Sequence, residues 1–186
     1  MSTKRIIVLE SLVLLATVAG FLSIRRALTG VTCLGGEGVF RQKYAYDCGN
    51  AALQMVFASF EVTVSYEELL QALKTTTAGT SMLSLKHLAE AKGLRCEGWK
   101  LSPGDLREIP LPAILFLRKN HFVVLDGLVG SGDFLVRDPA RGRLQIAPQK
   151  LQSIWGGEIL LFRKPGNGSN QHERWFRSFP SSKRSN

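Results

Sequence analysis

The spacing of apolar residues changes once along this chain, near residue 94, and this change constrains the fold more than any other feature. Before it, apolar side chains recur at helical spacing, which predicts helices over 48–60, 65–74 and 81–92. After it, short apolar runs separated by Pro, Gly and Asn predict strands over 94–101, 113–118, 121–128, 134–138, 143–146 and 158–162, with a helical turn over 149–155. N-terminal helices packed on an antiparallel sheet, an α+β fold, are therefore expected.

Residues 6–24 form an almost continuous apolar stretch with basic residues on both sides. At ~1.5 Å per residue, a helix of this length nearly crosses a hydrocarbon core of ~30 Å. We therefore expect residues 1–30 to hold one transmembrane helix; a signal peptide cut near Ala19 is the alternative. A short basic N-terminal tail is typical of the cytoplasmic side, which predicts a single-pass membrane protein with its domain outside the cytoplasm.

The remaining chain divides into three parts by composition. Glycines over 31–38 predict a flexible connector, 39–164 form the folded domain, and 165–186 lack any apolar period and predict a disordered basic tail. The formal net charge is +9, and most of it lies in the two terminal segments. Basic flanks without a basic folded face argue against a nucleic-acid partner.

Cys48 stands where the connector turns into the first predicted helix. The three cysteines, Cys33, Cys48 and Cys96, show no zinc-binding spacing and no disulfide framework, so no metal or cofactor is implied. A helix N-terminus favours a thiolate, and thiol pKa values at such sites fall to ~3.5–7.5 from about 8.5. Gly49 is expected to leave room for a substrate carbonyl. Without a partner, a small core thiol is the alternative.

The partner of a nucleophilic cysteine is sought among three histidines. His172 lies in the tail, and His87 lies in the middle of a helix, where a surface position is expected. His121 begins a strand directly after a polar turn, from which its ring can point into a cleft. We therefore expect the Cys48 Sγ within about 4 Å of a His121 ring nitrogen.

Two aspartates compete for the far nitrogen of His121, and hairpin geometry separates them. If the strands 121–128 and 134–138 pair as a hairpin, His121 lies opposite about residue 140, next to Asp138. Asp126 is about 16 Å along the same strand at ~3.3 Å per residue, and on the opposite face. Asp138 is therefore the expected orienting acid.

Three motifs in this order and spacing resemble the double-glycine leader peptidases, which are papain-like cysteine peptidases that mature bacteriocin precursors and are often fused to export transporters. The motifs are Gln42-x4-Asp47-Cys48-Gly49-x-Ala51, His121-Phe122-Val123-Val124-Leu125, and Asp138-Pro139 followed by Gly142. The resemblance implies a papain-like fold, with Cys48 as nucleophile, His121 as base and Asp138 as orienting acid. It also implies that Gln42 supplies a side-chain amide to the oxyanion hole, while Asp47 is expected to be a cap or a local hydrogen-bond partner.

The function implied by this resemblance is cleavage of a precursor or leader peptide after a small-residue, Gly-Gly-like pair. The implied partners are the precursor, the membrane through residues 6–24, and an export transporter. No phosphate loop follows up to Asn186, so a stand-alone peptidase is expected. The alternatives are an inactive domain that only binds leader peptides, and another papain-like enzyme such as an amidase or acyltransferase.

Overall fold

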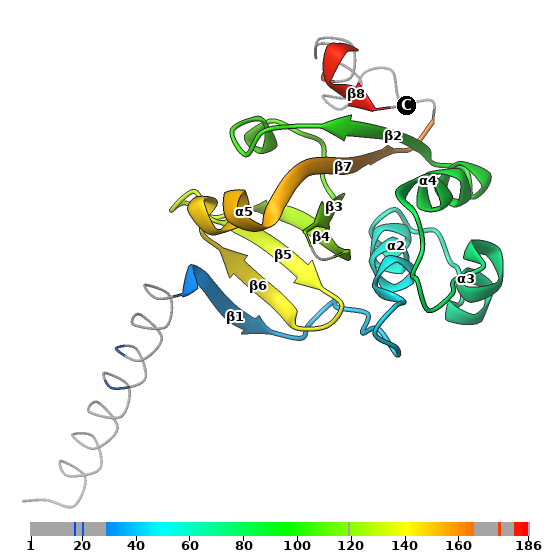
Figure 1. The fold of residues 1–186 in the computed structure, drawn as a ribbon, viewed down its shortest axis with the longest axis horizontal. Helices are drawn as coiled ribbons and strands as arrows, with labels where there is room; N and C mark the ends of the chain where they lie inside the picture. The colour runs from blue at the N-terminus through cyan, green and yellow to red at the C-terminus, as the bar shows by residue number, and fades with distance from the viewer. Residues whose placement is uncertain are drawn as a thin grey trace, which may run out of the picture.

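The computed structural model describes residues 17, 20, 29–118, 120–165, 175 and 181–185. In this part of the chain, one antiparallel sheet carries helices against it, as Figure 1 shows. The expected transmembrane segment 6–24 lies outside the described residues except for Thr17 and Gly20. Among the described residues, no helix has the length and apolar character needed to cross a bilayer.

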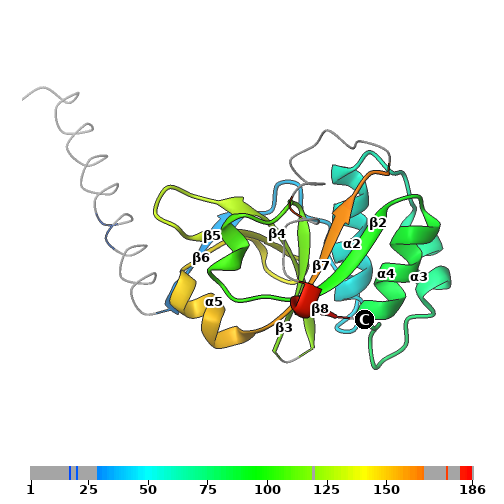
Figure 2. The same ribbon diagram turned by 90° about the horizontal axis from the view of Figure 1, so that it is seen from above.

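The sheet has eight strands in the order β1-β6-β5-β4-β3-β7-β2-β8, and all neighbours run antiparallel. The strands are β1 (Val31–Gly35), β2 (Arg95–Lys100), β3 (Ala113–Leu117), β4 (His121–Leu128), β5 (Phe134–Asp138), β6 (Gly142–Ile146), β7 (Trp155–Arg163) and β8 (Arg184–Ser185). The helices are α2 (Cys48–Ser59), α3 (Tyr66–Leu73), α4 (Met82–Ala91) and α5 (Pro148–Ile154), with short 3₁₀ turns η1 (Asp105–Arg107) and η2 (Ser181–Lys183). Figures 1 and 2 show α2, α3 and α4 gathered at one side of the sheet. The α+β prediction is confirmed.

The local signals at the helix ends explain where the predicted helices begin and stop. Ser65 caps α3 by accepting a hydrogen bond from the Glu68 N–H (3.1 Å), and Ser81 caps α4 in the same way. Gly93, just after α4, has a φ of +87°, a conformation that glycine adopts without strain. The three helices expected before residue 94 are therefore confirmed.

The sheet separates two apolar cores, because alternate side chains of its central strands point to opposite faces. On β4, Phe122 and Val124 pack with α2, α3 and α4, whereas Val123 and Leu125 pack in a second core with α5. Helix α2 is deeply embedded in the first core, where Leu53 is fully buried. This burial fixes the helix against β4, and so fixes the first residue of α2 relative to the first residue of β4.

The glycine-rich segment 31–38 differs from the flexible connector that its composition predicted. Residues Val31–Gly35 form strand β1, which pairs with β6 at one edge of the sheet. The Gly38 carbonyl accepts a hydrogen bond from the guanidinium of the buried Arg137 (3.2 Å). The backbone of this segment finds hydrogen-bond partners on the sheet that a composition argument could not anticipate.

The C-terminal segment also differs from expectation, which was a disordered tail over 165–186. Trp175 is buried, and its ring meets the Trp99 ring edge-on at a centroid distance of 5.3 Å. Strand β8 pairs with β2, and Arg184 forms an ion pair with Glu97. Burial of a large aromatic ring is strongly favourable, and it holds Trp175 against Trp99 although the composition around Trp175 is polar.

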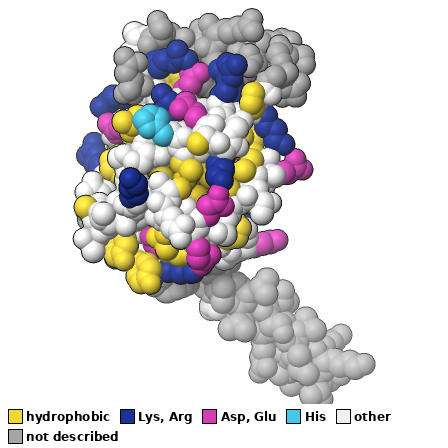
Figure 3. Space-filling model, turned by 90° about the vertical axis from the view of Figure 1, so that its right-hand side faces the viewer, with side chains coloured by type: hydrophobic (Ala, Val, Ile, Leu, Met, Phe, Trp, Pro, Cys, Tyr) yellow, Lys and Arg dark blue, Asp and Glu magenta, His cyan; other side chains and the backbone are white. Residues whose placement is uncertain are grey.

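The surface that carries the helices has no large area of one charge sign. Figure 3 shows Lys and Arg interspersed with Asp and Glu over the described residues of this face. On this face, the described charges do not form a continuous basic area of the kind that binds nucleic acid.

Candidate active site

Cys48 is the first residue of α2, and only 5% of it is exposed. The carbonyl of Asp47 accepts the first hydrogen bond of the helix, from the Ala51 N–H (3.2 Å). The N–H groups of residues 48–50 therefore have no acceptor within the helix, and the positive end of the helix dipole lies beside the thiol. The Sγ atom lies 4.0 Å from the carbonyl oxygen of Asn120, in the turn before β4.

His121 and Asp138 meet as the expected hairpin register requires. Val124 pairs with Arg137 and Leu125 with Val136, so the register near His121 is the one predicted; beyond Leu125 a bulge shifts it by one residue. The His121 Nε2 lies 2.9 Å from the Asp138 Oδ1. Since Nε2 faces the carboxylate, Nδ1 is the ring nitrogen left for Cys48, which is close enough to help raise the pKa of His121.

The ionisation of this pair is set by burial and by the two neighbours. Burial alone would lower the pKa of His121, but the hydrogen bonds and charges of Asp138 and Cys48 outweigh it and raise the pKa to about 9. Burial alone would raise the pKa of Asp138, but His121 and the N–H groups of Ala140 and Arg141 hold it below its ordinary value. At neutral pH the pair is therefore an imidazolium facing a carboxylate.

Asp126, the other aspartate near His121 in the sequence, is bound to Arg137. Its carboxylate forms an ion pair with Arg137 at 2.6 Å, and Arg137 also donates to the Ser59 hydroxyl at the end of α2. Asp126 thus links β4, β5 and α2 on the helix-bearing side of the sheet. The structure brings Asp138, and not Asp126, to the ring of His121.

Gln42 lies in the loop that leads into α2 and is tied to the strand end that carries Asp138. Its backbone N–H donates to the Pro139 carbonyl (3.2 Å), and its side-chain Nε2 donates to the Tyr44 carbonyl (2.7 Å). Its Oε1 is buried without a hydrogen-bond partner among the described residues. These bonds place Gln42 beside the end of β5 and orient its amide within its own loop.

Asp47 occupies the N-cap position of α2, but its side chain is a hydrogen-bond partner of the preceding loop. Its side chain makes no capping bond to α2. Instead, the fully buried carboxylate accepts hydrogen bonds from the backbone N–H groups of Lys43 and Tyr44 (both 3.1 Å) and from the hydroxyl of Tyr66. The loop between Gln42 and Cys48 is therefore folded around this carboxylate.

Gly49 is required by packing, which differs from the open space for a substrate that the sequence suggested. A Cβ atom at this position would lie 2.4 Å from the Thr80 Cγ2 and 3.2 Å from the Phe122 Cδ2. Such distances force a neighbour to move, so any larger residue would push Thr80 away from the first turn of α2. Thr80 is distant from Gly49 along the chain, so local patterns do not predict this contact.

A pocket of about 510 Å³ opens beside Cys48. Aromatic rings and small or neutral polar side chains line it: Ala45, Tyr46, Cys48, Thr77, Ala78, Gly79, Thr80, Phe116, Asn120 and Phe122. The wall contains no Lys, Arg, Asp or Glu, so the pocket is neutral. Among the described residues, no cluster of His, Cys, Asp or Glu is arranged to hold a metal ion.

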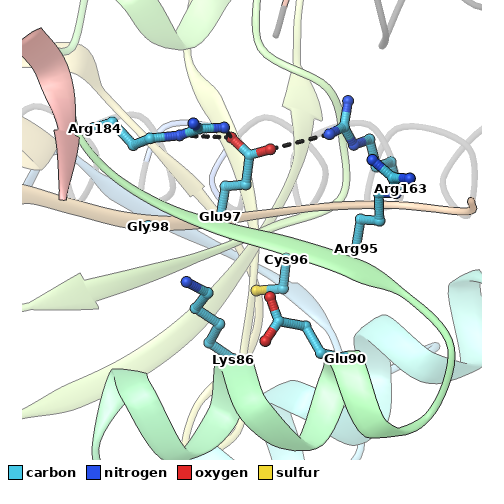
Figure 4. Close-up of a pocket in the computed structure, with 8 residues that line it drawn as sticks. All are labelled: Lys86, Glu90, Arg95, Cys96, Glu97, Gly98, Arg163 and Arg184. Atoms are coloured by element: carbon cyan, nitrogen blue, oxygen red, sulfur yellow. Dashed lines mark hydrogen bonds and ion pairs between the residues drawn. The ribbon is translucent and has the colours of Figure 1, made fainter. Parts of the chain in front are cut away.

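A second hollow, of about 350 Å³, lies between α4 and β2 and is charged (Figure 4). Glu97 forms ion pairs with Arg163 (3.0 Å) and Arg184 at its rim, while Lys86 rises from α4. Burial raises the pKa of the Cys96 thiol in its wall, and the lining includes no histidine to act as a base. This hollow therefore lacks the groups needed for thiol catalysis.

Known proteins are similar to this chain over the region that contains Cys48, His121 and Asp138. A model of the peptidase C39 family matches residues 37–167. An uncharacterised protein of Methanothermobacter thermautotrophicus is 31% identical over 72% of this chain and 94% of its own length. The probable functional amyloid protease FapD of Pseudomonas aeruginosa is 28% identical over 68% of this chain and 60% of its own. A solved double glycine motif protease from an AMS/PCAT transporter, in complex with the leader peptide, is 29% identical with a TM-score of 0.65, over 71% of this chain and 96% of that one.

Proposed function

Because this chain belongs to the peptidase C39 family, we propose that it is a cysteine endopeptidase that cleaves a precursor or leader peptide after a Gly-Gly-like pair of small residues. The similarity to a double glycine motif protease confirms the resemblance that the motifs indicated. The observation that carries the proposal is the contact of His121 with Asp138, beside a cysteine at a helix N-terminus.

The first chemical step is attack by the Cys48 thiolate on the carbonyl carbon of the scissile peptide bond. The carbonyl oxygen becomes an oxyanion, for which the Cys48 N–H and the Gln42 side-chain amide are the proposed donors. An amide nitrogen carries two N–H groups, so the bond from Gln42 to the Tyr44 carbonyl leaves the second one for the oxyanion. Loss of one such donor lowers the rate by ~10²–10³ in comparable enzymes.

His121 moves the protons of the reaction. Its imidazolium, held through Nε2 by Asp138, donates the Nδ1 proton to the leaving amine as the C–N bond breaks, and a thioester with Cys48 remains. The neutral ring then takes a proton from a water molecule that attacks the thioester. Release of the carboxylic acid restores the thiolate and the imidazolium, with no metal or organic cofactor in the cycle.

The pocket beside Cys48 supports a preference for small residues before the cut. Thr80 and Phe122 lie close to Gly49, and their side chains narrow the pocket next to the nucleophile. Glycine residues, which carry no Cβ atom, fit beside such a wall, whereas a branched side chain would have to displace Thr80. A Gly-Gly pair also matches what the related double glycine motif protease is named for.

The proposed activity is tested with two synthetic peptides that differ only before the scissile bond. We expect the full chain to cleave the peptide with a Gly-Gly pair, and to cleave the matched Val-Val peptide at least about 100-fold more slowly, because the branched side chains meet Thr80 and Phe122. Mass spectrometry identifies the new N-terminus. Equal cleavage of both peptides would contradict the proposed specificity.

The same assay separates the proposal from its alternatives. A domain that only binds leader peptides would retain the peptide and release no product. Another papain-like enzyme, such as an amidase or acyltransferase, would modify Cys48 during turnover without producing a new peptide N-terminus.

We also propose that residues 6–24 anchor the protein in a membrane, with the domain outside the cytoplasm and an export transporter as partner. A variant that lacks residues 1–28 is expected to leave the membrane fraction and to keep its peptidase activity. It retains Gly30, whose carbonyl accepts a hydrogen bond from the Ala147 N–H (2.8 Å). Alkaline extraction of membranes followed by immunoblotting measures the distribution. A folded truncation that stays with the membranes would show that the anchor is misassigned.

A further inference from the structure

Tyr66, the first residue of α3, contacts the loop that carries Gln42 at two points. Its hydroxyl donates to the buried carboxylate of Asp47, and its ring lies beneath the Lys43 ammonium, 3.9 Å from the nitrogen to the ring centroid. Tyr66 does not line the pocket beside Cys48. Any influence of Tyr66 on the reaction must therefore pass through the loop.

The carboxylate of Asp47 is the centre of that loop. It is inaccessible to solvent, and a buried charge of this kind is tolerated only when several donors surround it. Two donors are backbone N–H groups of the loop itself, at Lys43 and Tyr44, and the third is the Tyr66 hydroxyl. Tyr66 is thus the donor that ties this carboxylate to a separate element, α3.

A continuous set of hydrogen bonds leads from Tyr66 to the Gln42 amide. Tyr66 holds Asp47, Asp47 holds the N–H of Tyr44, and the carbonyl of Tyr44 accepts from the Gln42 Nε2 (2.7 Å). The other end of the loop is held by the Gln42 N–H on the Pro139 carbonyl (3.2 Å). The amide of Gln42 is therefore fixed from the helices on one side and from β5 on the other.

We propose that Tyr66 and Asp47 are positioning residues, which hold the loop so that the Gln42 amide is preset for the oxyanion before substrate binds. This inference rests on the proposed peptidase function. Donors that are oriented in advance need no reorganisation when charge develops, which is the main source of oxyanion stabilisation. Burial and the Asp47 carboxylate also raise the pKa of Tyr66, so its hydroxyl keeps its proton, and remains a donor, at alkaline pH.

The replacement Tyr66→Phe removes only the hydroxyl. We expect kcat for the Gly-Gly peptide to fall about 10- to 100-fold with KM nearly unchanged, since small displacements of a catalytic group have effects of this size. Alkylation of Cys48 by iodoacetamide, followed by mass spectrometry, should keep its rate and its pH profile, because that reaction forms no oxyanion. The matched control is Ser65→Ala, which removes the cap of α3 but keeps both the Tyr66 hydroxyl and the Asp47 carboxylate.

A double-mutant cycle tests whether Tyr66 acts through Gln42. If it does, Tyr66→Phe introduced into Gln42→Ala should lower kcat by less than about twofold, because the amide to be positioned is already absent. The full loss in that background, an unaltered kcat in Tyr66→Phe alone, or an equal loss in Ser65→Ala would each overturn the inference.

The side-chain amide signals of Gln42 in a ¹H–¹⁵N spectrum, identified by their loss in Gln42→Ala, report the amide position without any catalysis. They should shift in Tyr66→Phe and stay in place in Ser65→Ala. If the parent protein cleaves no peptide but the Gln42 signals still shift in Tyr66→Phe, the proposed function is rejected and the positioning role is upheld. Signals that do not move in Tyr66→Phe would reject the positioning role even if cleavage is confirmed.

Discussion

Replacement of Cys48 by serine is expected to lower peptide cleavage by at least about 10⁴-fold while the fold stays intact, the scale of loss seen when a nucleophile is removed from a catalytic unit. Serine keeps the size of the side chain, which is buried at the start of α2. A hydroxyl is not ionised by an imidazole that already holds its proton, whereas a thiol at a helix N-terminus is readily converted to a thiolate. Cleavage rates with the Gly-Gly peptide provide the measurement.

Cys33→Ser is the matched control for this substitution. Cys33 is an exposed thiol on β1, so the same atomic change there should leave the cleavage rate within about twofold of the parent, as is usual for surface substitutions. Circular dichroism verifies that both variants are folded. Residual cleavage above 10% of the parent rate in Cys48→Ser would remove Cys48 from the role of nucleophile.

Replacement of Asp138 by alanine should reduce turnover by about 10³- to 10⁴-fold, since His121 loses both its orientation and the partner of its positive charge. Asp138→Asn should be milder, because papain-like enzymes function with an amide at this place. Asp126→Asn is the control: it keeps an acceptor for the buried Arg137 and should leave activity within a few-fold of the parent. An inactive Asp126→Asn with an active Asp138→Ala would exchange the two roles.

The pH profile reports the same contact independently. His121 has a pKa of about 9, raised by Asp138 and Cys48 against the opposing effect of burial, so it keeps its proton through neutral pH and loses it near pH 9. The kcat/KM of the parent should therefore fall as pH rises through about 9, when the leaving amine can no longer be protonated. In Asp138→Ala the alkaline limb should move to lower pH, because a main contribution that raises the pKa is gone.

The helices and the meander could be predicted because their signals are local. Ser65 and Ser81 precede apolar stretches at helical spacing, and the hairpin loop fixed the register that brings Asp138 to His121. The pairing of Cys48 with His121 is a prediction from chemistry, because a nucleophilic thiol requires a base and the chain has three histidines.

Other contacts cannot be predicted from local sequence patterns, because they join residues that are distant along the chain. The backbone of β1 pairs with β6, which lies about a hundred residues away, and Trp175 finds Trp99 across a polar stretch. The hydroxyl of Tyr66 meets Asp47 only because α3 folds back on the loop before α2. These contacts depend on the tertiary arrangement, which composition and periodicity do not encode position by position.

The pairing of β1 with the sheet also determines how far the active site can travel. Gly30 and Val31 are already hydrogen-bonded to the β6–α5 region, so the sheet begins to hold the chain at Gly30. If residues 6–24 lie in a bilayer as proposed, only the few residues between 24 and Gly30 separate the bilayer from the sheet, and their length limits how far Cys48 can move from the membrane. The distance between the membrane and the scissile bond of a membrane-held precursor would then act as a ruler, selecting cleavage sites by their position as well as by their side chains.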